Sequence, residues 1–308
     1  MDNRVIAIRN EVKKAIVGKD EVIDRALTAI IAGGHILIDD IPGVGKTTMA
    51  LAFSKAMGLV FRRVQFNPDV VPSDITGFTM YDKQSGEFKY MNGAAMCNFL
   101  LADEINRTSS KTQSALLEVM QEGKVTVDSK TYRLPDPFIV MATQNPIGAV
   151  GTQMLPEAQL DRFMIQISMG YPDKEAQFKL LKDRNTSNPL DQVARVISVT
   201  DLAQMKNQCK LTYVDDKIYM YITSIAEATR NHQYIKLGLS PRGALALADM
   251  AKADAYVNGV DFVSPENVQN VLKDVCRHRI IMEPKAQLEN IDVEKVLDEI
   301  MANVKAPK

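Results

Sequence analysis

The chain has 308 residues, of which 46% are hydrophobic and 24% are charged, and its formal net charge is −1. This length is enough for two domains with a large apolar core that needs neither disulfides nor a structural metal. The near-neutral charge argues against a protein that coats nucleic acid over its whole surface, although it allows a local basic patch.

The cysteines and the N-terminal segment bear on location. Cys97, Cys209 and Cys276 are odd in number and far apart, so they predict no disulfide framework. Segment 1–20 has no apolar signal region and predicts an amphipathic helix. No apolar run approaches the roughly 20 residues that a membrane-spanning helix needs. We therefore expect a cytoplasmic protein with no membrane segment.

In the first half of the chain, short apolar runs alternate with amphipathic stretches, which predicts an α/β sheet. Because the runs contain few polar residues, we expect strands that are covered on both faces, as in a parallel sheet. Ser110 and Gln113 fit a capping box that opens a helix. Residues 124–134 predict a hairpin. The five predicted strands are 35–38, 60–66, 98–102, 138–143 and 163–168.

From residue 173 onward, strand signals almost disappear and helical patterns dominate. Ser240-Pro241 and Ser264-Pro265 each place a capping serine before a proline at the first helical position. We therefore predict an α/β domain at 1–171 and a smaller helical domain at 172–308, joined near Tyr171. The predicted helices are 174–183, 201–206, 215–229, 241–258 and 265–279.

The segment 37–49 is the most informative part of the sequence. It reads LIDDIPGVGKTTM and runs from an apolar strand through a glycine-rich loop into a helix. Gly45, Lys46 and Thr47 match the end of the phosphate-loop pattern G-x-x-x-x-G-K-[ST]. Asp40 stands at the position of the first glycine, so the strict pattern is missed by one residue.

The chemistry of this glycine-rich loop favours phosphate binding although Asp40 replaces the first glycine. Gly43 and Gly45 let backbone N–H groups turn inward around a β-phosphate. The helix that begins near Lys46 adds its N-terminal dipole and free N–H groups. Lys46 can reach the β- and γ-phosphate oxygens, and the Thr47 hydroxyl can ligate Mg²⁺. The segment therefore predicts a site for ATP and Mg²⁺.

A carboxylate pair, Asp103 and Glu104, follows the apolar run FLLA. Asp103 is placed to hold magnesium, and Glu104 to polarise a water for attack on the γ-phosphate. Asn145 follows the next strand, where ligands collect in open parallel sheets, and could orient that water. The structural alternative for Asn145 is an Asn-Pro turn.

Two arginines have two interpretations each. Arg162 precedes the fifth strand and is either a surface partner of Asp161 or a group that reaches a γ-phosphate; the sequence leaves both open. Arg242 opens a helix of the second half, and its structural alternative is an exposed first-turn arginine, which the helix dipole disfavours slightly.

Together these residues resemble the AAA+ ATPases, and specifically the MoxR family. The resemblance implies a P-loop AAA+ domain with a parallel five-stranded sheet, followed by a smaller all-helical lid domain. It covers nearly the whole α/β domain and the start of one lid helix. The segments that carry it are DDIPGVGKT, NPDVVPSDITGF, LLADEINR, KTQSALLEVMQE, ATQNP, LPEAQLDRF, GYP and LSPRGALAL.

The resemblance also implies a role for each candidate residue. Lys46 and Thr47 resemble Walker A, and Asp103 and Glu104 resemble Walker B. Asn145 is similar to sensor 1, Arg162 to an arginine finger that acts on the neighbouring subunit, and Arg242 to sensor 2. The implied nucleotide contacts are Ile16, Val17, Gly18, Pro42, Gly43, Val44, Gly45, Lys46, Thr47 and Thr48, with Thr47 and Asp103 at the metal.

Family membership would make the protein an ATPase that remodels or activates partner proteins in a chaperone-like way. A finger that acts in trans requires a ring, which we expect to be hexameric, and the family's frequent partners contain a von Willebrand factor A domain. Segments 73–93 and 124–134 resemble insertions that project towards substrate or pore. The alternative is a nucleic-acid or metal-chelatase type motor subunit, but segment 124–134 is only mildly basic, so nucleic acid is not favoured.

Overall fold

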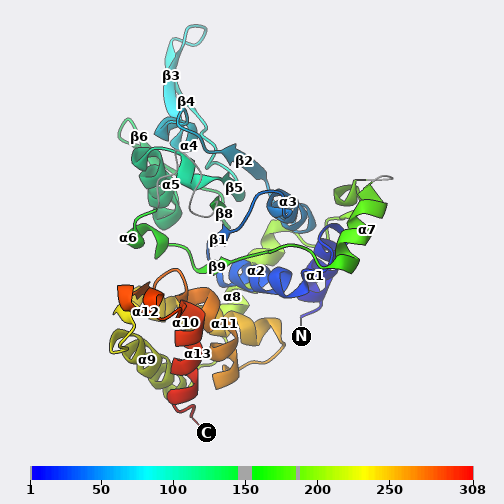
Figure 1. Ribbon diagram of the computed structural model, residues 1–308. Coiled ribbons are helices and arrows are strands. Elements are labelled where there is room, and N and C mark those ends of the chain that lie inside the picture. Colours follow the sequence, from blue (N-terminus) through cyan, green and yellow to red (C-terminus); the bar gives the residue numbers. More distant parts are fainter. Residues whose placement is uncertain (1, 145–154, 185–187, 308) are drawn as a thin grey trace.

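Figure 1 shows the computed structural model, which describes residues 2–144, 155–184 and 188–307. A parallel five-stranded sheet with the order β2-β5-β8-β1-β9 forms the α/β part. This confirms the predicted fold class and all five predicted strands, within two residues at each end. The strands are β1 (Ile36–Asp39), β2 (Phe61–Gln65), β5 (Phe99–Asp103), β8 (Ile139–Gln144) and β9 (Ile165–Ile167).

Alternate residues of each strand point to opposite faces of the sheet. In β1, Ile36 and Ile38 belong to one buried cluster and Leu37 to another. The first cluster includes residues of α1 (Asn3–Ala15), α2 (Asp20–Ala32) and α3 (Lys46–Ala56). The second includes residues of α4 (Pro72–Thr76) and α5 (Ser110–Glu122). Burial on both faces explains why the strands read as continuous apolar runs.

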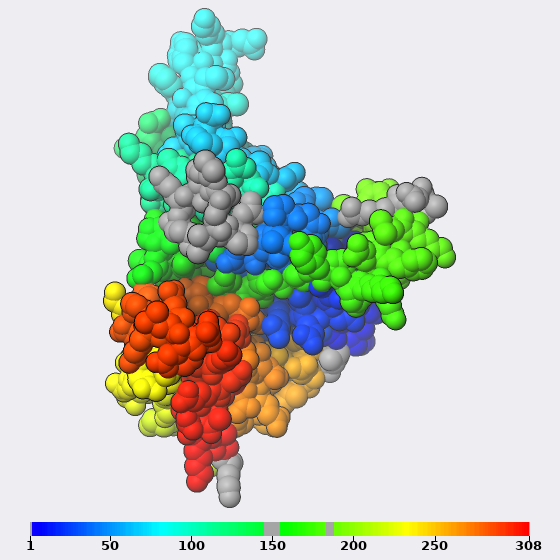
Figure 2. Space-filling view, in the orientation of Figure 1, coloured from blue at the N-terminus to red at the C-terminus, as the bar shows by residue number. Residues whose placement is uncertain are grey.

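Two hairpins interrupt the α/β pattern. One pairs β3 (Phe78–Asp82) with β4 (Glu87–Met91), and it projects well beyond the rest of the molecule (Figures 1 and 2). The other pairs β6 (Lys124–Val127) with β7 (Lys130–Arg133) and confirms the hairpin predicted at 124–134. Tyr90 and Tyr132 stack with ring centroids 4.0 Å apart, so the two hairpins contact each other.

The predicted cap of α5 was wrong by one residue. Ser109, not Ser110, is the N-cap, and its hydroxyl accepts from the backbone N–H of Thr112. Gln113 is instead buried, and its side-chain amide donates to the carbonyl of Ile105 at 3.0 Å. The sequence offers two adjacent serines, and tertiary contacts at this turn, such as the bond from the Thr112 hydroxyl to the carbonyl of Val70 at 2.9 Å, are not readable from it.

The second half confirms the five predicted helices, although α8 is longer and α11 shorter than expected. Ser240 and Ser264 cap α10 and α11, as predicted, by accepting from the N–H groups of Gly243 and Asn267. A two-stranded ribbon of β10 (Ile235–Leu237) and β11 (Ile281–Met282) and the last two helices were not predicted. The helices are α7 (Lys174–Arg184), α8 (Val199–Lys210), α9 (Asp216–Arg230), α10 (Pro241–Val257), α11 (Pro265–Cys276), α12 (Pro284–Leu288) and α13 (Val293–Asn303).

Short helical turns occupy three connections: η1 (Ile105–Arg107), α6 (Glu157–Leu160) and η2 (Pro189–Gln192). Cys97, Cys209 and Cys276 are buried free thiols. In the described part of the chain, no helix combines the length and the apolar character needed to cross a membrane.

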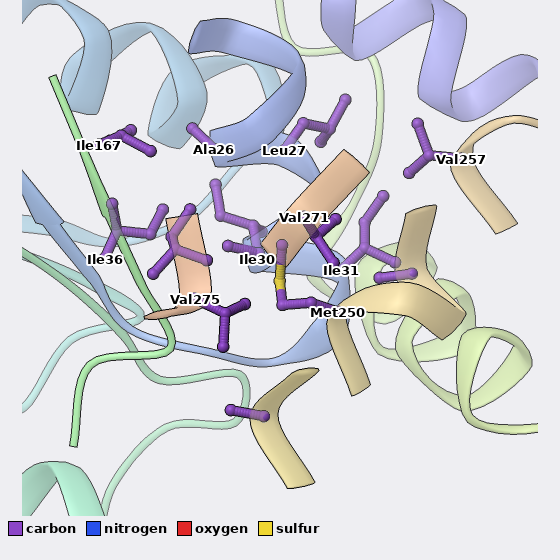
Figure 3. Close-up of a cluster of buried hydrophobic side chains, with 14 of the residues drawn as sticks. Ala26, Leu27, Ile30, Ile31, Ile36, Ile167, Met250, Val257, Val271 and Val275 are labelled. Carbon is purple, nitrogen blue, oxygen red and sulfur yellow. The ribbon is translucent and has the colours of Figure 1, made fainter. Parts of the chain in front are cut away.

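The apolar core crosses the predicted domain boundary at residue 171. Figure 3 shows α2 side chains packed among residues of α10 and α11, beside β1 and β9. The labelled side chains come from both halves of the chain, and they are Ala26, Leu27, Ile30, Ile31, Ile36, Ile167, Met250, Val257, Val271 and Val275. The division at 171 stays a prediction, but the two halves share one core that fixes how they are oriented.

Arg279 adds a polar connection between the halves. Its side chain is only 3% exposed, and Nε donates to Asp161 Oδ1 at 2.7 Å. The same guanidinium donates to the carbonyls of Phe163 at 2.5 Å and Met164 at 3.0 Å, just before β9. The helical part is therefore tied to the edge of the sheet where the strands begin.

We predict that Arg279→Ala lowers the free energy of unfolding by about 3–5 kcal/mol, because it leaves a carboxylate and several carbonyls without their buried partner. The urea-unfolding midpoint measures the effect. Arg133→Ala is the control, because Arg133 is exposed on β7, and we expect a change of at most about 0.5 kcal/mol. Equal midpoints for the two variants would contradict the prediction.

Candidate functional site

The loop between β1 and α3 lies at the edge of the sheet where the parallel strands end. Gly43 and Gly45 have φ angles of 85° and 99°, a region that glycine adopts without steric cost. Gly45 is also the N-cap of α3, whose first N–H groups have no partner within the helix. The loop borders a cavity of about 340 Å³ lined by Pro42, Gly43, Gly45, Lys46, Thr47, Thr48, Arg63, Gln65, Asp103 and Glu104.

Lys46 brings a buried positive charge to this cavity. The residue is 8% exposed, and Nζ donates to the backbone carbonyl of Asp40 at 2.6 Å. Burial lowers the pKa of Lys46, and the carboxylates of Asp40 and Asp103 oppose that shift. A cation at the start of α3, where the first N–H groups of the helix have no partner within it, favours a polyanion in the cavity.

Asp103 lies at the end of β5 on the opposite wall. Its Oδ2 accepts from Arg63 Nη2 at 2.7 Å, and its Oδ1 accepts from the Thr143 hydroxyl at 2.6 Å. Arg63 comes from β2 and Thr143 from β8, so the neighbouring strands on both sides fix this carboxylate. The ion pair shows that the position beside Asp103 favours positive charge.

Glu104 follows directly and is fixed by a different set of contacts. Its Oε2 accepts from Gln65 Nε2 at 2.8 Å and from Arg107 Nη1 at 2.9 Å. Its backbone has φ 57° and ψ 48°, a left-handed conformation that costs about 1–2 kcal/mol for a residue other than glycine. The Glu104 N–H donates to Thr143 Oγ1 at 2.9 Å, which stabilises this conformation.

A second, mostly apolar cavity of about 330 Å³ adjoins the first and shares three of its residues. Together they form an elongated site with a polar end and an apolar end, as expected for a ligand that joins phosphates to a planar base. The second cavity is lined by Ala15, Ile16, Val17, Lys19, Gly43, Val44, Gly45, Thr48, Met169, Tyr171, Pro172, Gln177, Leu180 and Leu181.

Gly18 does not line the apolar cavity, but it allows the wall to form. Its φ is 73°, and a Cβ at this position would lie 2.7 Å from the Cβ of Ala176 on α7. The absence of a side chain therefore lets α7 approach the segment after α1. Gln177, Leu180 and Leu181 of α7 reach the cavity because of this close approach.

Arg162 lies at the other edge of the sheet. It precedes β9, which runs parallel to β1 with Ile165 opposite Ile36. Because β1 rises about 3.3 Å per residue over its length, the two edges are at least about 10 Å apart. Arg162 lines a separate cavity with α5 and β6 residues, including Glu118 and Glu122. Among the described residues, no group bonds its buried Nε.

Arg242 lies on the same side as Arg162. It is exposed in the first turn of α10. At the start of this helix, the Ser240 hydroxyl donates to Asp161 Oδ2 at 3.1 Å, and Gly243 lies beside the Arg279 side chain. The structure therefore brings neither Arg162 nor Arg242 to the loop of its own chain.

The remaining predicted residue, Asn145, lies outside the described residues. Sequence reasoning missed Arg63, Gln65 and Thr143, which contact the two carboxylates. The signal was present for two of them, because Arg63 and Gln65 alternate at the end of a strand. No sequence pattern indicated that α7 lines the apolar cavity, because this depends on the close approach of α7 to Gly18 in the folded chain.

The donor set at the polar end fits a divalent cation bound together with phosphate. The described residues contain no group of three or more His, Cys, Asp or Glu side chains that could hold a metal ion alone. Thr47 and Asp103 line the same cavity and supply hard oxygen ligands. Mg²⁺ is usually held by one or two such groups plus substrate phosphates, and it keeps several waters.

Comparisons with known proteins agree with this chemistry. Residues 35–165 match the family described as "ATPase family associated with various cellular activities (AAA)", and residues 227–300 match the AAA lid domain. An uncharacterised Bacillus subtilis protein, YeaC, is 45% identical over 96% of this chain and 92% of its own length. Chaperone MoxR1 of Mycobacterium tuberculosis is 38% identical over 97% of this chain and 81% of its own.

A solved structure is also similar over nearly its whole length. The crystal structure of a candidate ATPase from Cytophaga hutchinsonii superposes with a TM-score of 0.93 and is 39% identical. The match covers 99% of this chain and 96% of that one.

We predict that Gly18→Ala displaces α7, because the new Cβ meets Ala176, and that amide hydrogens of α7 exchange faster. Hydrogen–deuterium exchange measures this directly. The matched control is Gly123→Ala, which has a φ of 62° but no atom within 4 Å of the new Cβ. Both variants place an alanine at a positive φ, so they share the backbone strain. An equal rise of amide exchange in α7 in both variants would therefore contradict the steric explanation.

Proposed function

Since the chain belongs to the MoxR family of AAA+ ATPases, we propose that it hydrolyses Mg²⁺-ATP at sites that a neighbouring subunit completes. One observation carries the proposal: the phosphate loop and the two candidate arginines lie at opposite edges of one parallel sheet. A single subunit then offers one half of a hydrolysis site at each edge.

The cavities assign the parts of ATP to different residues. The adenine occupies the apolar cavity beside Ile16 and Val17, and the phosphates lie on the loop Pro42–Thr48 with Lys46 at their β- and γ-oxygens. Thr47 and Asp103 would hold Mg²⁺, which supplies neutralisation of the phosphate charge.

Glu104 is the proposed general base. Its carboxylate lines the phosphate cavity, where it can accept a proton from a water that attacks the γ-phosphate. Gln65 and Arg107 orient the carboxylate through the two hydrogen bonds to Oε2. Asn145 is proposed to orient the same water, on the resemblance to sensor 1 alone.

The two arginines are proposed to act in trans. In a ring, the edge that carries Arg162 and Arg242 faces the phosphate loop of the next subunit, and both positive charges approach its γ-phosphate. An added arginine at this position accelerates related phosphoryl transfers by about 10³–10⁵. We propose six subunits per ring, as the family resemblance implies.

The ATPase cycle is proposed to remodel or activate a protein partner. A relative named as a chaperone supports this class of function. The projecting β3–β4 hairpin exposes Phe78, Met80, Tyr81 and Phe88, side chains that suit contact with another protein. We propose a partner with a von Willebrand factor A domain, on the resemblance to the family alone.

The nucleic-acid alternative has little support from the β6–β7 hairpin, which is only mildly basic. In and beside the β6–β7 hairpin, Lys124, Lys130 and Arg133 are offset by Asp128 and Asp136. A motor on single strands combines a basic groove with stacking aromatics. Stimulation of hydrolysis by single-stranded DNA would favour this alternative over a protein partner.

We predict that ATP turnover per subunit rises with protein concentration, together with particle mass, because each site needs an arginine from its neighbour. Hydrolysis assays and size measurements on the same samples, with and without ATP, test the proposal. Turnover per subunit that stays flat across the assembly range would contradict it.

A further inference from the structure

Asp40 is the residue that departs from the phosphate-loop pattern, and both oxygens of its buried carboxylate accept hydrogen bonds. The residue is 6% exposed. Its Oδ2 accepts from the Ser168 hydroxyl at 3.0 Å and from the N–H groups of Met169 and Gly170 at 2.6 Å each. Its Oδ1 accepts from the N–H of Ile41 at 2.8 Å. A glycine here could make none of these bonds.

The segment that Asp40 binds leads directly into the wall of the apolar cavity. Ser168–Gly170 follows β9, and Met169, Tyr171 and Pro172 all line that cavity. Lys19 Nζ donates to the carbonyl of Tyr171 at 2.7 Å, which gives the wall a second attachment. The exposed Lys19 contact is the weaker of the two, because solvent screens it.

We propose that Asp40 is a specificity-determining positioning residue, which ties the wall of the base cavity to the phosphate loop. Its carboxylate sets the distance between the surface that contacts the base and the loop that binds the phosphates. The proposal rests on the proposed function, because it assumes that the two cavities take the two ends of one nucleotide.

Charge makes this attachment strong. Hydrogen bonds from N–H groups to a buried carboxylate are shorter and about twice as strong as neutral ones. Without the carboxylate, the N–H groups of Met169 and Gly170 would lose their acceptor, and the wall could move away from the loop. Apolar contact with the base would then weaken.

At the phosphate end, the Asp40 carboxylate acts on Lys46 through its charge, which raises the pKa of Lys46 against the effect of burial. Lys46 Nζ bonds the backbone carbonyl of Asp40, which every substitution at this position retains. The turn at Gly43 and Gly45 and the start of α3 involve no Asp40 side-chain contact in the described structure. Base affinity and phosphate affinity should therefore respond differently to a change at Asp40.

Asp40→Asn and Asp40→Gly separate the two affinities. Calorimetry on the full chain gives dissociation constants for ATP and for inorganic tripolyphosphate. We expect ATP binding to weaken about tenfold or more in both variants, the size of one or two charged hydrogen bonds. Tripolyphosphate binding should not weaken, because both substitutions remove a negative charge that acts on Lys46.

Asp39→Asn is the matched control. Asp39 is the adjacent carboxylate on β1, but its Oδ2 bonds the side-chain amides of Gln144 and Gln166, not the wall segment. We expect this variant to leave the ratio of the two dissociation constants unchanged. Lys46→Ala should weaken both ligands together.

The outcomes distinguish the inference from the proposed function. Wild-type protein that binds neither ligand would contradict the proposed function itself. If the wild-type protein binds both ligands and the Asp40 variants lose affinity for ATP and tripolyphosphate equally, the positioning role is overturned. Unchanged ATP affinity in the variants would overturn it as well. A loss of affinity for ATP but not for tripolyphosphate supports the positioning role. If Asp40→Gly does not fold, Asp40→Asn alone provides this result.

Discussion

Strand polarity is the constraint on which the site depends. Because all five strands of the central sheet are parallel, every strand end that carries a polar residue lies at one edge. The phosphate loop, Asp103 and Glu104 line one cavity there. The same polarity places Arg162, which precedes a strand, at the other edge. The proposed ATPase site is accordingly divided between the edges of two molecules.

The position of the helical half follows from packing against that sheet. Residues of α2, α10 and α11 share one apolar cluster, and Arg279 bonds the segment before β9. These contacts keep the first turn of α10, and with it Arg242, on the same side as Arg162. Asp40 makes the corresponding connection at the phosphate edge, between the loop and the segment that leads to α7.

Local patterns predicted the parts of the protein that local chemistry determines. Apolar runs identified the five strands, and the motif identified Lys46 and Asp103 at the same edge. The contacts of Thr143 and the wall formed by α7 depend on distances between segments remote in sequence, which no local pattern contains. The two adjacent serines were ambiguous for the same reason, since residues at the start of α5 bond segments outside the helix.

The central claim is that one subunit's arginine completes another's site. The most direct test mixes two inactive variants, Arg162→Ala, which keeps an intact phosphate edge, and Glu104→Gln, which keeps an intact arginine edge. In a mixed ring, Glu104→Gln subunits present Arg162 to the intact pockets of their neighbours, so ATP turnover should return above that of either variant alone. Mixed assemblies, verified by mass, that remain inactive would contradict the account.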